Sequence, residues 1–169
     1  MPIRRARTAD VPAIRRCVRD AYAVYLDRLD RPPAPLGHDV AAQVAAGRVF
    51  VERGAALRGV LVVVPAPDHL EIENLAVRPE HQGQGVGRRL LAFAERRART
   101  LGLSEVRLYT HEKMVENQRY YAARGYRELR RGIEDGYARV FYAKLLRAVS
   151  RPRSRSARSR SVGAGDGIK

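Results

Sequence analysis

Cysteine is nearly absent from this sequence, with Cys17 the only one in 169 residues. A single thiol excludes an intrachain disulfide and a metal site built from several cysteines, and it indicates a reducing compartment. Long apolar runs are missing too, because the longest, residues 59–64, falls far short of the roughly 20 residues that a membrane-spanning helix needs. The first five residues lack the apolar core and cleavage site of a signal peptide. These absences predict a cytoplasmic protein without a membrane anchor.

Lysine and acidic residues are scarce beside arginine. The sequence has 33 Lys and Arg against 18 Asp and Glu, a formal net charge of +15, and only three of the basic residues are lysine. Residues 147–169 carry seven basic residues and one acidic residue, a contribution of +6 that leaves +9 on the preceding part. This Arg/Ser-rich tail has almost nothing apolar to bury, so we expect it to be disordered. Residues 1–146 are expected to form one domain.

Hydrophobic periodicity and turn residues predict strands interleaved with helices. Strands are expected over residues 3–7, 49–53, 57–64, 69–77, 106–110, 126–130 and 138–145. Helices are expected from Thr8 or Asp10 to Tyr25 and over residues 39–46, 86–101 and 117–124, with the proline-rich residues 31–37 as a loop. This order predicts a mixed α/β (α+β) fold, in which about four helices flank one central sheet of about seven strands.

The strand that ends at Val77 changes phase along its length. Leu70 and Ile72 are apolar at even positions, whereas Leu75 and Val77 are apolar at odd positions. Since strand side chains alternate faces, one extra residue near Asn74, a β-bulge, would restore a single buried face. Bulges leave backbone N–H groups unpaired, and such groups stabilise the oxyanion that develops in acyl transfer. An equally weighted alternative is a strand end that is buried on both faces.

A glycine-rich turn follows this strand, with the sequence Gln82-Gly83-Gln84-Gly85-Val86-Gly87-Arg88-Arg89. The turn opens the helix predicted over residues 86–101, and the free N–H groups of a helix N-terminus bind phosphate. Arg88 and Arg89 add positive charge there. A Walker A loop is excluded because Arg88 stands where lysine is required, and the glycine spacing excludes the dinucleotide fingerprint. A plain flexible turn is the less favoured alternative to a phosphate site.

Two segments carry a resemblance to one family. Residues 74–91 resemble the acetyl-CoA signature of the GNAT superfamily of N-acetyltransferases, and residues 117–126 resemble its distal Asn-x-x-x-Tyr-x-x-x-Gly-Phe/Tyr motif. The resemblance covers about residues 3–144. It implies a GNAT-like fold with a β-bulge and splayed central strands, and acetyl-CoA as the acyl donor without a metal.

The resemblance also implies which residues bind acetyl-CoA. In this family the backbone of the bulged strand binds the acetyl carbonyl and the pantetheine arm, and the turn holds the pyrophosphate. Carried over to this sequence, the cofactor-binding residues are Leu75, Ala76, Val77, Gln82, Gly83, Gln84, Gly85, Val86, Gly87, Arg88 and Asn117.

Acyl transfer to an amine needs a base and an acid as well. A lysine-like amine has a pKa of about 10.4 and must lose a proton before it attacks. Glu73, beside the predicted bulge, is the candidate base. Glu71 and a chain of water molecules are alternative bases. An equally weighted alternative is that Glu73 is an ordinary exposed carboxylate without a catalytic role. Tyr121, which the resemblance places near the CoA sulfur, is the candidate acid, with a packing role in the core as its alternative. The four histidines are interpreted as surface or loop residues: His38, His69, His81 and His111.

The sequence defines the acceptor of the acetyl group less well than the donor. In this family it enters opposite the cofactor, against a surface that here includes Tyr22, Tyr25, residues 28–37 and residues 134–136. Four acidic residues there are candidates to attract a cationic amine, and are equally compatible with plain solvated surface: Asp27, Asp30, Glu134 and Asp135.

The sequence therefore predicts an acetyl-CoA-dependent N-acetyltransferase that acts on a primary amine by direct attack in a ternary complex. A small-molecule acceptor is favoured over a protein. Two alternatives remain, a nucleic-acid-associated protein whose basic tail contacts polyanions nonspecifically and a catalytically silent acetyl-CoA-binding domain. The sequence does not choose between a monomer and a homodimer.

Overall fold

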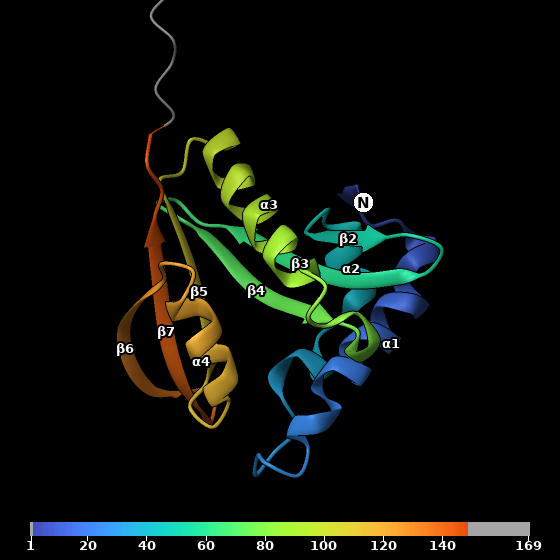
Figure 1. Ribbon diagram of the computed structural model, residues 1–169, viewed down its shortest axis with the longest axis horizontal. Helices are drawn as coiled ribbons and strands as arrows, with labels where there is room; N and C mark the ends of the chain where they lie inside the picture. The colour runs from blue at the N-terminus through green and yellow to red at the C-terminus, as the bar shows by residue number, and fades with distance from the viewer. Residues whose placement is uncertain (1, 149–169) are drawn as a thin grey trace, which may run out of the picture.

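The structure is a computed structural model that describes residues 2–148, so the predicted tail lies outside the described residues from position 149 onward. Seven strands form one sheet in the order β1-β2-β3-β4-β5-β7-β6 (Figure 1). The strands are β1 (Ile3–Arg5), β2 (Val49–Arg53), β3 (Leu57–Pro65), β4 (Leu70–Val77), β5 (Glu105–His111), β6 (Arg127–Glu134) and β7 (Tyr137–Leu145). Only the β4–β5 pair is parallel among the described strands, which confirms the predicted mixed sheet.

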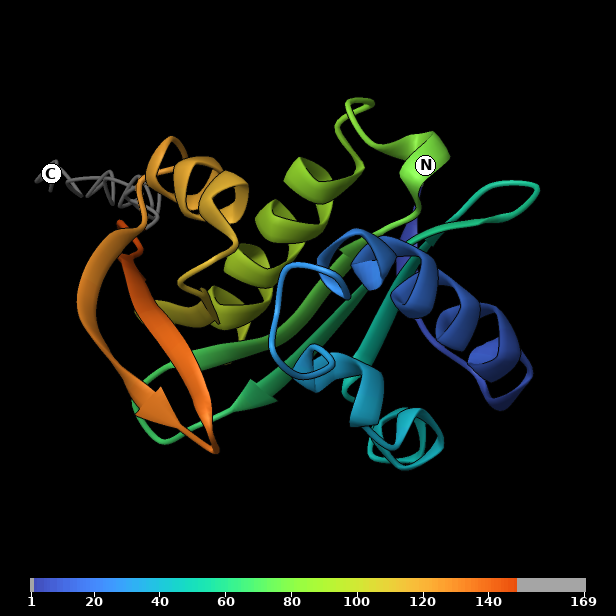
Figure 2. The same cartoon turned by 90° about the horizontal axis from the view of Figure 1, so that it is seen from below.

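Four α-helices cover the two faces of this sheet, as predicted. Helices α1 (Val11–Tyr22) and α2 (Val40–Ala45) lie on one face, and α3 (Val86–Thr100) and α4 (Val115–Ala122) lie on the other (Figure 2). Each face therefore has its own apolar core, which we call the α1-side core and the α3-side core. No helix of residues 2–148 combines the length and apolar character needed to cross a bilayer.

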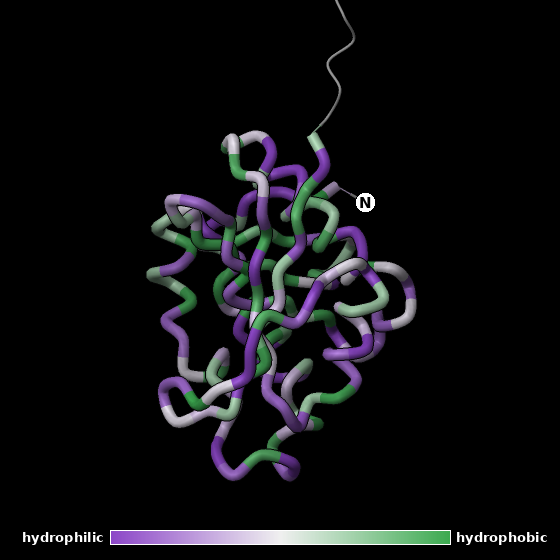
Figure 3. The backbone as a smooth tube through the Cα atoms, turned by 90° about the vertical axis from the view of Figure 1, so that its left-hand side faces the viewer, coloured by the Kyte–Doolittle hydropathy of each residue, from purple (hydrophilic) through white to green (hydrophobic). Residues whose placement is uncertain are grey.

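Two elements differ from the sequence-based prediction by more than two residues at one end. Helix α1 ends at Tyr22, and a 3-10 turn continues the predicted helix to Tyr25; a second 3-10 turn, Ala34–Gly37, lies in the predicted proline-rich loop. Strand β6 continues four residues beyond the predicted end at Arg130. The residues of β6 are mostly polar and exposed, so the strand has no alternation of apolar and polar residues by which its end could be predicted. Its extra length depends on pairing with β7, at the edge of the sheet that faces the viewer in Figure 3.

The predicted β-bulge is present in β4. Along the pairing with β3, Val62 lies opposite Asn74 and Val63 lies opposite Ile72, so Glu73 is the extra residue. An extra residue of this kind is left unpaired and bends its strand.

The bulge keeps one face of β4 on the α3-side core. Leu70 packs there before the bulge, and Leu75 and Val77 pack there after it. Ala76 faces the α1-side core instead. Both readings of the sequence therefore hold, because the strand has a bulge and its last residues are covered on both faces.

The bulge also coincides with the point where the two central strands separate. Strand β4 pairs with β5 only over Leu70–Ile72, opposite Val106–Leu108. Beyond Ile72 the two strands diverge (Figure 1), which confirms the predicted splay and opens the sheet at their C-terminal ends.

Candidate functional site

A cleft of about 610 Å³ lies between the diverging strands. The end of β4 forms one wall, α4 forms the other, and the glycine-rich turn lies at the start of α3. Ten of the eleven predicted cofactor-binding residues line it: Leu75, Ala76, Val77, Gln82, Gly83, Gly85, Val86, Gly87, Arg88 and Asn117. The exception is Gln84, whose side-chain amide donates a hydrogen bond to the Glu80 carbonyl (2.9 Å).

The backbone of the turn requires glycine at several positions. Gly83 and Gly85 have φ values of +75° and +77°, in the left-handed region that side chains disfavour. Gly87 meets a different constraint, because a Cβ atom there would lie 2.8 Å from the Tyr120 hydroxyl oxygen. The turn therefore brings its backbone, and the first N–H groups of α3, directly against the cleft.

The two arginines that follow have separate roles. Arg88 lines the cleft, and no ion pair of its guanidinium is recorded in residues 2–148. Arg89 instead forms two hydrogen bonds with the carboxylate of Glu52 (2.7 and 2.9 Å), whose side chain is fully buried, and a third with the Gln84 carbonyl (3.1 Å). Arg89 therefore fixes the turn, and Arg88 supplies the charge at the cleft. Glu52 was not predicted as part of the site, and the signal that could have identified it is an acidic residue directly after the apolar run of residues 49–51.

Two buried polar groups beside the turn fit an anionic ligand. The Tyr120 hydroxyl and the Arg124 Nε lack a hydrogen-bond partner within the described residues, and both side chains line the cleft. The Arg124 guanidinium lies 3.5 Å from the centre of the Tyr120 ring. Leaving a buried donor unpaired costs about 1–3 kcal/mol, and phosphate oxygens would pair these groups. The residues present thus fit the phosphate groups of acetyl-CoA.

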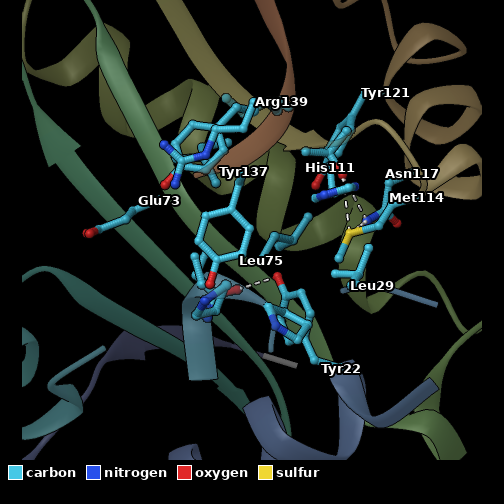
Figure 4. Close-up of a pocket in the computed structure, with 18 residues that line it drawn as sticks. Tyr22, Leu29, Glu73, Leu75, His111, Met114, Asn117, Tyr121, Tyr137 and Arg139 are labelled. Atoms are coloured by element: carbon cyan, nitrogen blue, oxygen red, sulfur yellow. Dashed lines mark hydrogen bonds between the residues drawn. The ribbon is translucent and has the colours of Figure 1, made fainter. Parts of the chain in front are cut away.

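A second, smaller cavity of about 60 Å³ borders the cleft. Four side chains line both spaces: Tyr22, Leu75, Asn117 and Tyr121. The Tyr22 hydroxyl donates to the Asn74 side-chain carbonyl (2.8 Å), which ties α1 to the bulge (Figure 4). The loop after α1 covers this cavity and is held by a bond from the Tyr137 hydroxyl to the Pro32 carbonyl (2.7 Å). The structure thus brings the predicted acceptor-facing residue Tyr22 and part of the predicted loop together here.

Tyr121 lies where the two spaces meet. Its side chain is buried, with ring centres 5.4 Å from Tyr120 and 5.9 Å from Tyr126. Burial, and secondarily the neighbouring Tyr120, raises the pKa of the Tyr121 hydroxyl well above its usual value. No hydrogen bond of this hydroxyl to the described residues is recorded. The group therefore keeps its proton at neutral pH and is free to donate it.

The two candidate carboxylates are placed differently. Glu73 lines the smaller cavity, with its Oε2 3.5 Å from the Gln43 amide nitrogen, and its carboxylate points away from Tyr121 in Figure 4. Glu71 is not among the residues that line either space. Its Oε2 lies 3.4 Å from His69 Nε2, and burial raises its pKa. The geometry therefore favours Glu73 over Glu71 as the candidate base beside the cavity.

The interpretation of all four histidines as surface or loop residues is wrong for His111. This residue ends β5, is half-buried and lines the smaller cavity. Its Nδ1 accepts a hydrogen bond from the Lys113 N–H (3.1 Å), and burial lowers its pKa, so the ring is neutral. Its place at the open end of a central strand was the signal that could have identified it. The described residues contain no group of three or more His, Cys, Asp or Glu side chains that could hold a metal ion.

Arg139 was also missed. It lies in β7, lines the smaller cavity, and is only 6% exposed. Its Nη1 is 3.2 Å from Asp135 Oδ2 and 3.7 Å from Glu134 Oε1. The acidic turn proposed to attract a cationic amine is therefore already paired with arginine. An arginine directly before the apolar run of residues 140–143 was the signal.

Comparison with known proteins identifies relatives of the sequence. The sequence profile of the Acetyltransferase (GNAT) family matches residues 14–126. An aminoalkylphosphonate N-acetyltransferase of Salmonella typhimurium is 40% identical over 58 residues, which span 34% of this chain and 38% of that protein. The match thus spans well under half the length of this relative.

Solved structures share the fold over most of the chain. The PaiA N-acetyltransferase from Thermoplasma acidophilum, in complex with coenzyme A, has a TM-score of 0.72 at 16% identity, covering 85% of this chain and 98% of that one. The ribosomal-protein-S18-alanine N-acetyltransferase from Escherichia coli has a TM-score of 0.66 at 19% identity, covering 88% and 96%. The IAA acetyltransferase from Bacillus cereus has a TM-score of 0.63 at 25% identity, covering 86% and 99%. At such low identity, these likenesses show that the fold is shared.

Proposed function

The chain belongs to the GNAT acetyltransferase family, and we propose that it transfers the acetyl group of acetyl-CoA to the primary amine of a small molecule within a ternary complex. The observation that carries the proposal is the junction of the two cavities at Tyr121. The larger space suits a polyanionic arm, and about 60 Å³ suits a small acceptor better than a protein terminus. The relative that is named for an aminoalkylphosphonate supports a small-molecule amine.

Three parts of the cleft would hold the donor, which supplies an activated thioester when bound. Residues 75–77 of β4 have no partner strand on the cleft side, so their backbone groups there are available to the pantetheine arm and the acetyl carbonyl. The turn at residues 82–88 and the N-terminus of α3 would receive the pyrophosphate. The Asn117 amide, 3.4 Å from Thr110 Oγ1, would lie along the arm.

Two side chains would move the protons. As the amine nitrogen bonds to the acetyl carbon and the carbon–sulfur bond breaks, the amine loses one proton and the sulfur gains one. The Tyr121 hydroxyl would donate to the sulfur, since its proton is retained at neutral pH. Glu73 would accept from the amine through a water molecule, because the residue lines the smaller cavity while its carboxylate points away from Tyr121.

The proposal is tested by calorimetry and thiol release on the full chain. We expect acetyl-CoA and free CoA to bind in the micromolar range, about −8 kcal/mol, and a chromogenic thiol reagent to report CoA release when a small amine is added. Binding without release with any amine would support a catalytically silent domain instead. A folded chain that binds neither nucleotide would refute the proposal.

Replacing Glu73 by glutamine should lower turnover roughly 100-fold or more, the usual contribution of a general base. The rise of rate with pH should flatten, whereas acetyl-CoA affinity should not change. Glu71→Gln is the matched control, since it removes a carboxylate two residues away that pairs with His69 outside the cavity. A larger loss of rate in Glu71→Gln would assign the base to Glu71, and no loss in either variant would exclude both.

Gly87→Ala should weaken acetyl-CoA binding about tenfold or more without lowering stability. The added Cβ would lie 2.8 Å from the Tyr120 hydroxyl oxygen and push that side chain into the cleft. Alanine is favoured over glycine in a helix by about 1 kcal/mol, so α3 itself should not suffer. Gly37→Ala, where no atom lies within 4 Å of the new Cβ, is the control. Calorimetry and thermal unfolding of both variants check this, and unchanged affinity in Gly87→Ala would show that the turn does not contact the donor.

A further inference from the structure

Arg139 is an unusual residue to find in a small cavity. A buried arginine is costly unless its charge is paired, yet the ion pairs recorded for it involve only one end of the guanidinium, Nη1. No hydrogen bond of Nε or Nη2 is recorded within the described part of the chain. The guanidinium also stacks 4.1 Å from the centre of the Tyr109 ring and lies beside Tyr137 (Figure 4). One edge of a rigid, planar donor is thus held in place and another edge remains for a ligand.

The acidic turn next to Arg139 does not cancel its charge. Two carboxylates, Glu134 and Asp135, lie there, but two guanidinium groups pair with them and a third contacts the backbone of the turn. Arg139 pairs with both, and Arg130 Nη2 lies 3.2 Å from Glu134 Oε2. Arg31 Nη1 donates to the Asp135 backbone carbonyl (3.2 Å). The turn and the three arginines that contact it therefore carry a balance of +1, so its two carboxylates do not cancel the charge of these arginines.

The cavity is also lined by residues of both charges. Among its described lining residues, Glu73 is the acidic one and Arg139 the basic one, besides His111, whose pKa is lowered by burial. Glu73 extends from the bulge in β4, and Arg139 extends from β7 on the other side of the gap between the central strands. A molecule with an amine at one end and an anion at the other matches this arrangement.

We infer that the acceptor amine carries an oxyanion group, such as a carboxylate or a phosphonate, and that Arg139 binds this group. The inference rests on the proposed acetyl transfer. It follows from the geometry of the guanidinium, which presents parallel N–H donors that match the two oxygens of such a group. The small volume of the cavity restricts the chain between amine and anion to a few atoms.

The test is a panel of amines that share the skeleton H₂N–CH₂–CH₂–X. β-Alanine, taurine and aminoethylphosphonate carry an anionic X, ethanolamine carries a neutral one, and ethylenediamine carries a cationic one. With the full chain and saturating acetyl-CoA, we expect kcat/KM for the best anionic member to exceed that for ethanolamine roughly ten- to a hundredfold, the size of charge-assisted hydrogen bonds. Ethylenediamine should be the poorest substrate.

Arg139→Gln should abolish this preference, while Arg139→Lys should retain part of it. Arg130→Gln is the matched control, because it removes an arginine from the same acidic turn whose side chain is exposed and does not line the cavity. The control should keep the preference with at most a small reduction, because an exposed ion pair of this kind contributes little. Acetyl-CoA affinity should be the same in all three variants.

The possible outcomes separate the inference from the proposed function. Equal or better acetylation of ethanolamine or ethylenediamine by the unmodified chain would overturn the inference and leave acetyl transfer standing. A preference for anions that survives in folded Arg139→Gln would overturn the assignment to Arg139. No thiol release with any amine, despite bound acetyl-CoA, would overturn the proposed function and the inference together. The unmodified chain decides the substrate class even if Arg139→Gln does not fold.

Discussion

Replacing Tyr121 by phenylalanine should lower turnover roughly 10²–10⁴-fold, the range expected for loss of a general acid, and leave acetyl-CoA affinity unchanged. The hydroxyl lies where the two cavities meet, and burial keeps its proton in place. The ring is retained in phenylalanine, so its edge-on contacts with Tyr120 and Tyr126 should persist. The loss should therefore fall on kcat and not on binding or stability. Single-turnover kinetics and calorimetry measure the two quantities separately.

Two neighbouring tyrosines provide controls for this experiment. Tyr126→Phe removes a hydroxyl that bonds to Glu95 (3.2 Å) away from the cleft, and it should leave turnover unchanged. Tyr120→Phe removes the unpaired hydroxyl beside the turn and should weaken acetyl-CoA binding without a large loss of kcat. If Tyr120→Phe lost turnover and Tyr121→Phe did not, the proton donor would be Tyr120. Full turnover in both would exclude a tyrosine acid.

Arg89→Met should destabilise the fold by about 3 kcal/mol, within the range for breaking a buried ion pair. The Glu52 carboxylate has no exposed surface, so it would be left buried and unpaired. The reverse change, Glu52→Gln, should cost less, because the Arg89 side chain is 36% exposed and water can solvate it. A loss of about 3 kcal/mol corresponds to roughly 6–12 °C in Tm for a chain of this size.

Replacing the adjacent residue, Arg88, should change acetyl-CoA binding without changing stability. Arg88→Met removes a cation that lines the cleft without a recorded ion pair in the described residues, so it should weaken acetyl-CoA binding and leave Tm nearly unchanged. Because Arg89 also bonds to the Gln84 carbonyl, Arg89→Met should weaken binding in addition to lowering Tm. The double variant Glu52→Leu with Arg89→Met should recover part of the lost stability, since both charges are then absent. Equal Tm values for the two single arginine variants would contradict this division of roles.

Local features of the sequence were sufficient to predict much of the fold. The seven strands and four helices follow from periodicity and turn residues, and the phase change between Ile72 and Leu75 located the bulge within one residue. These features are visible because alternation in a strand and spacing in a helix are properties of consecutive residues. Strand β6 was predicted too short for the same reason, since its exposed edge has no alternation and depends on its partner strand.

The residues of the candidate site were predicted or missed for the same reason. The glycine turn and the residues facing the cleft were predicted because they lie in two short segments, residues 74–91 and 117–126, whose types and spacing reflect the backbone contacts of a single ligand. Side chains contributed by other strands were missed. Glu52, His111 and Arg139 come from β2, β5 and β7, and no spacing along the chain indicates that they meet the site.

The amino-acid sequence alone was enough to predict the family, the donor site and the candidate acid, because the resemblance that implies them is carried by neighbouring residues in the chain. The tertiary structure decided the partner of each charge. It showed that Arg89 pairs with Glu52 and not with the cleft, and that Arg139 is held at the smaller cavity. Electrostatic interactions depend on distance and burial in three dimensions, and sheet pairing sets both between residues far apart in the chain. The charge that the acceptor must carry could therefore be inferred only once the fold was known.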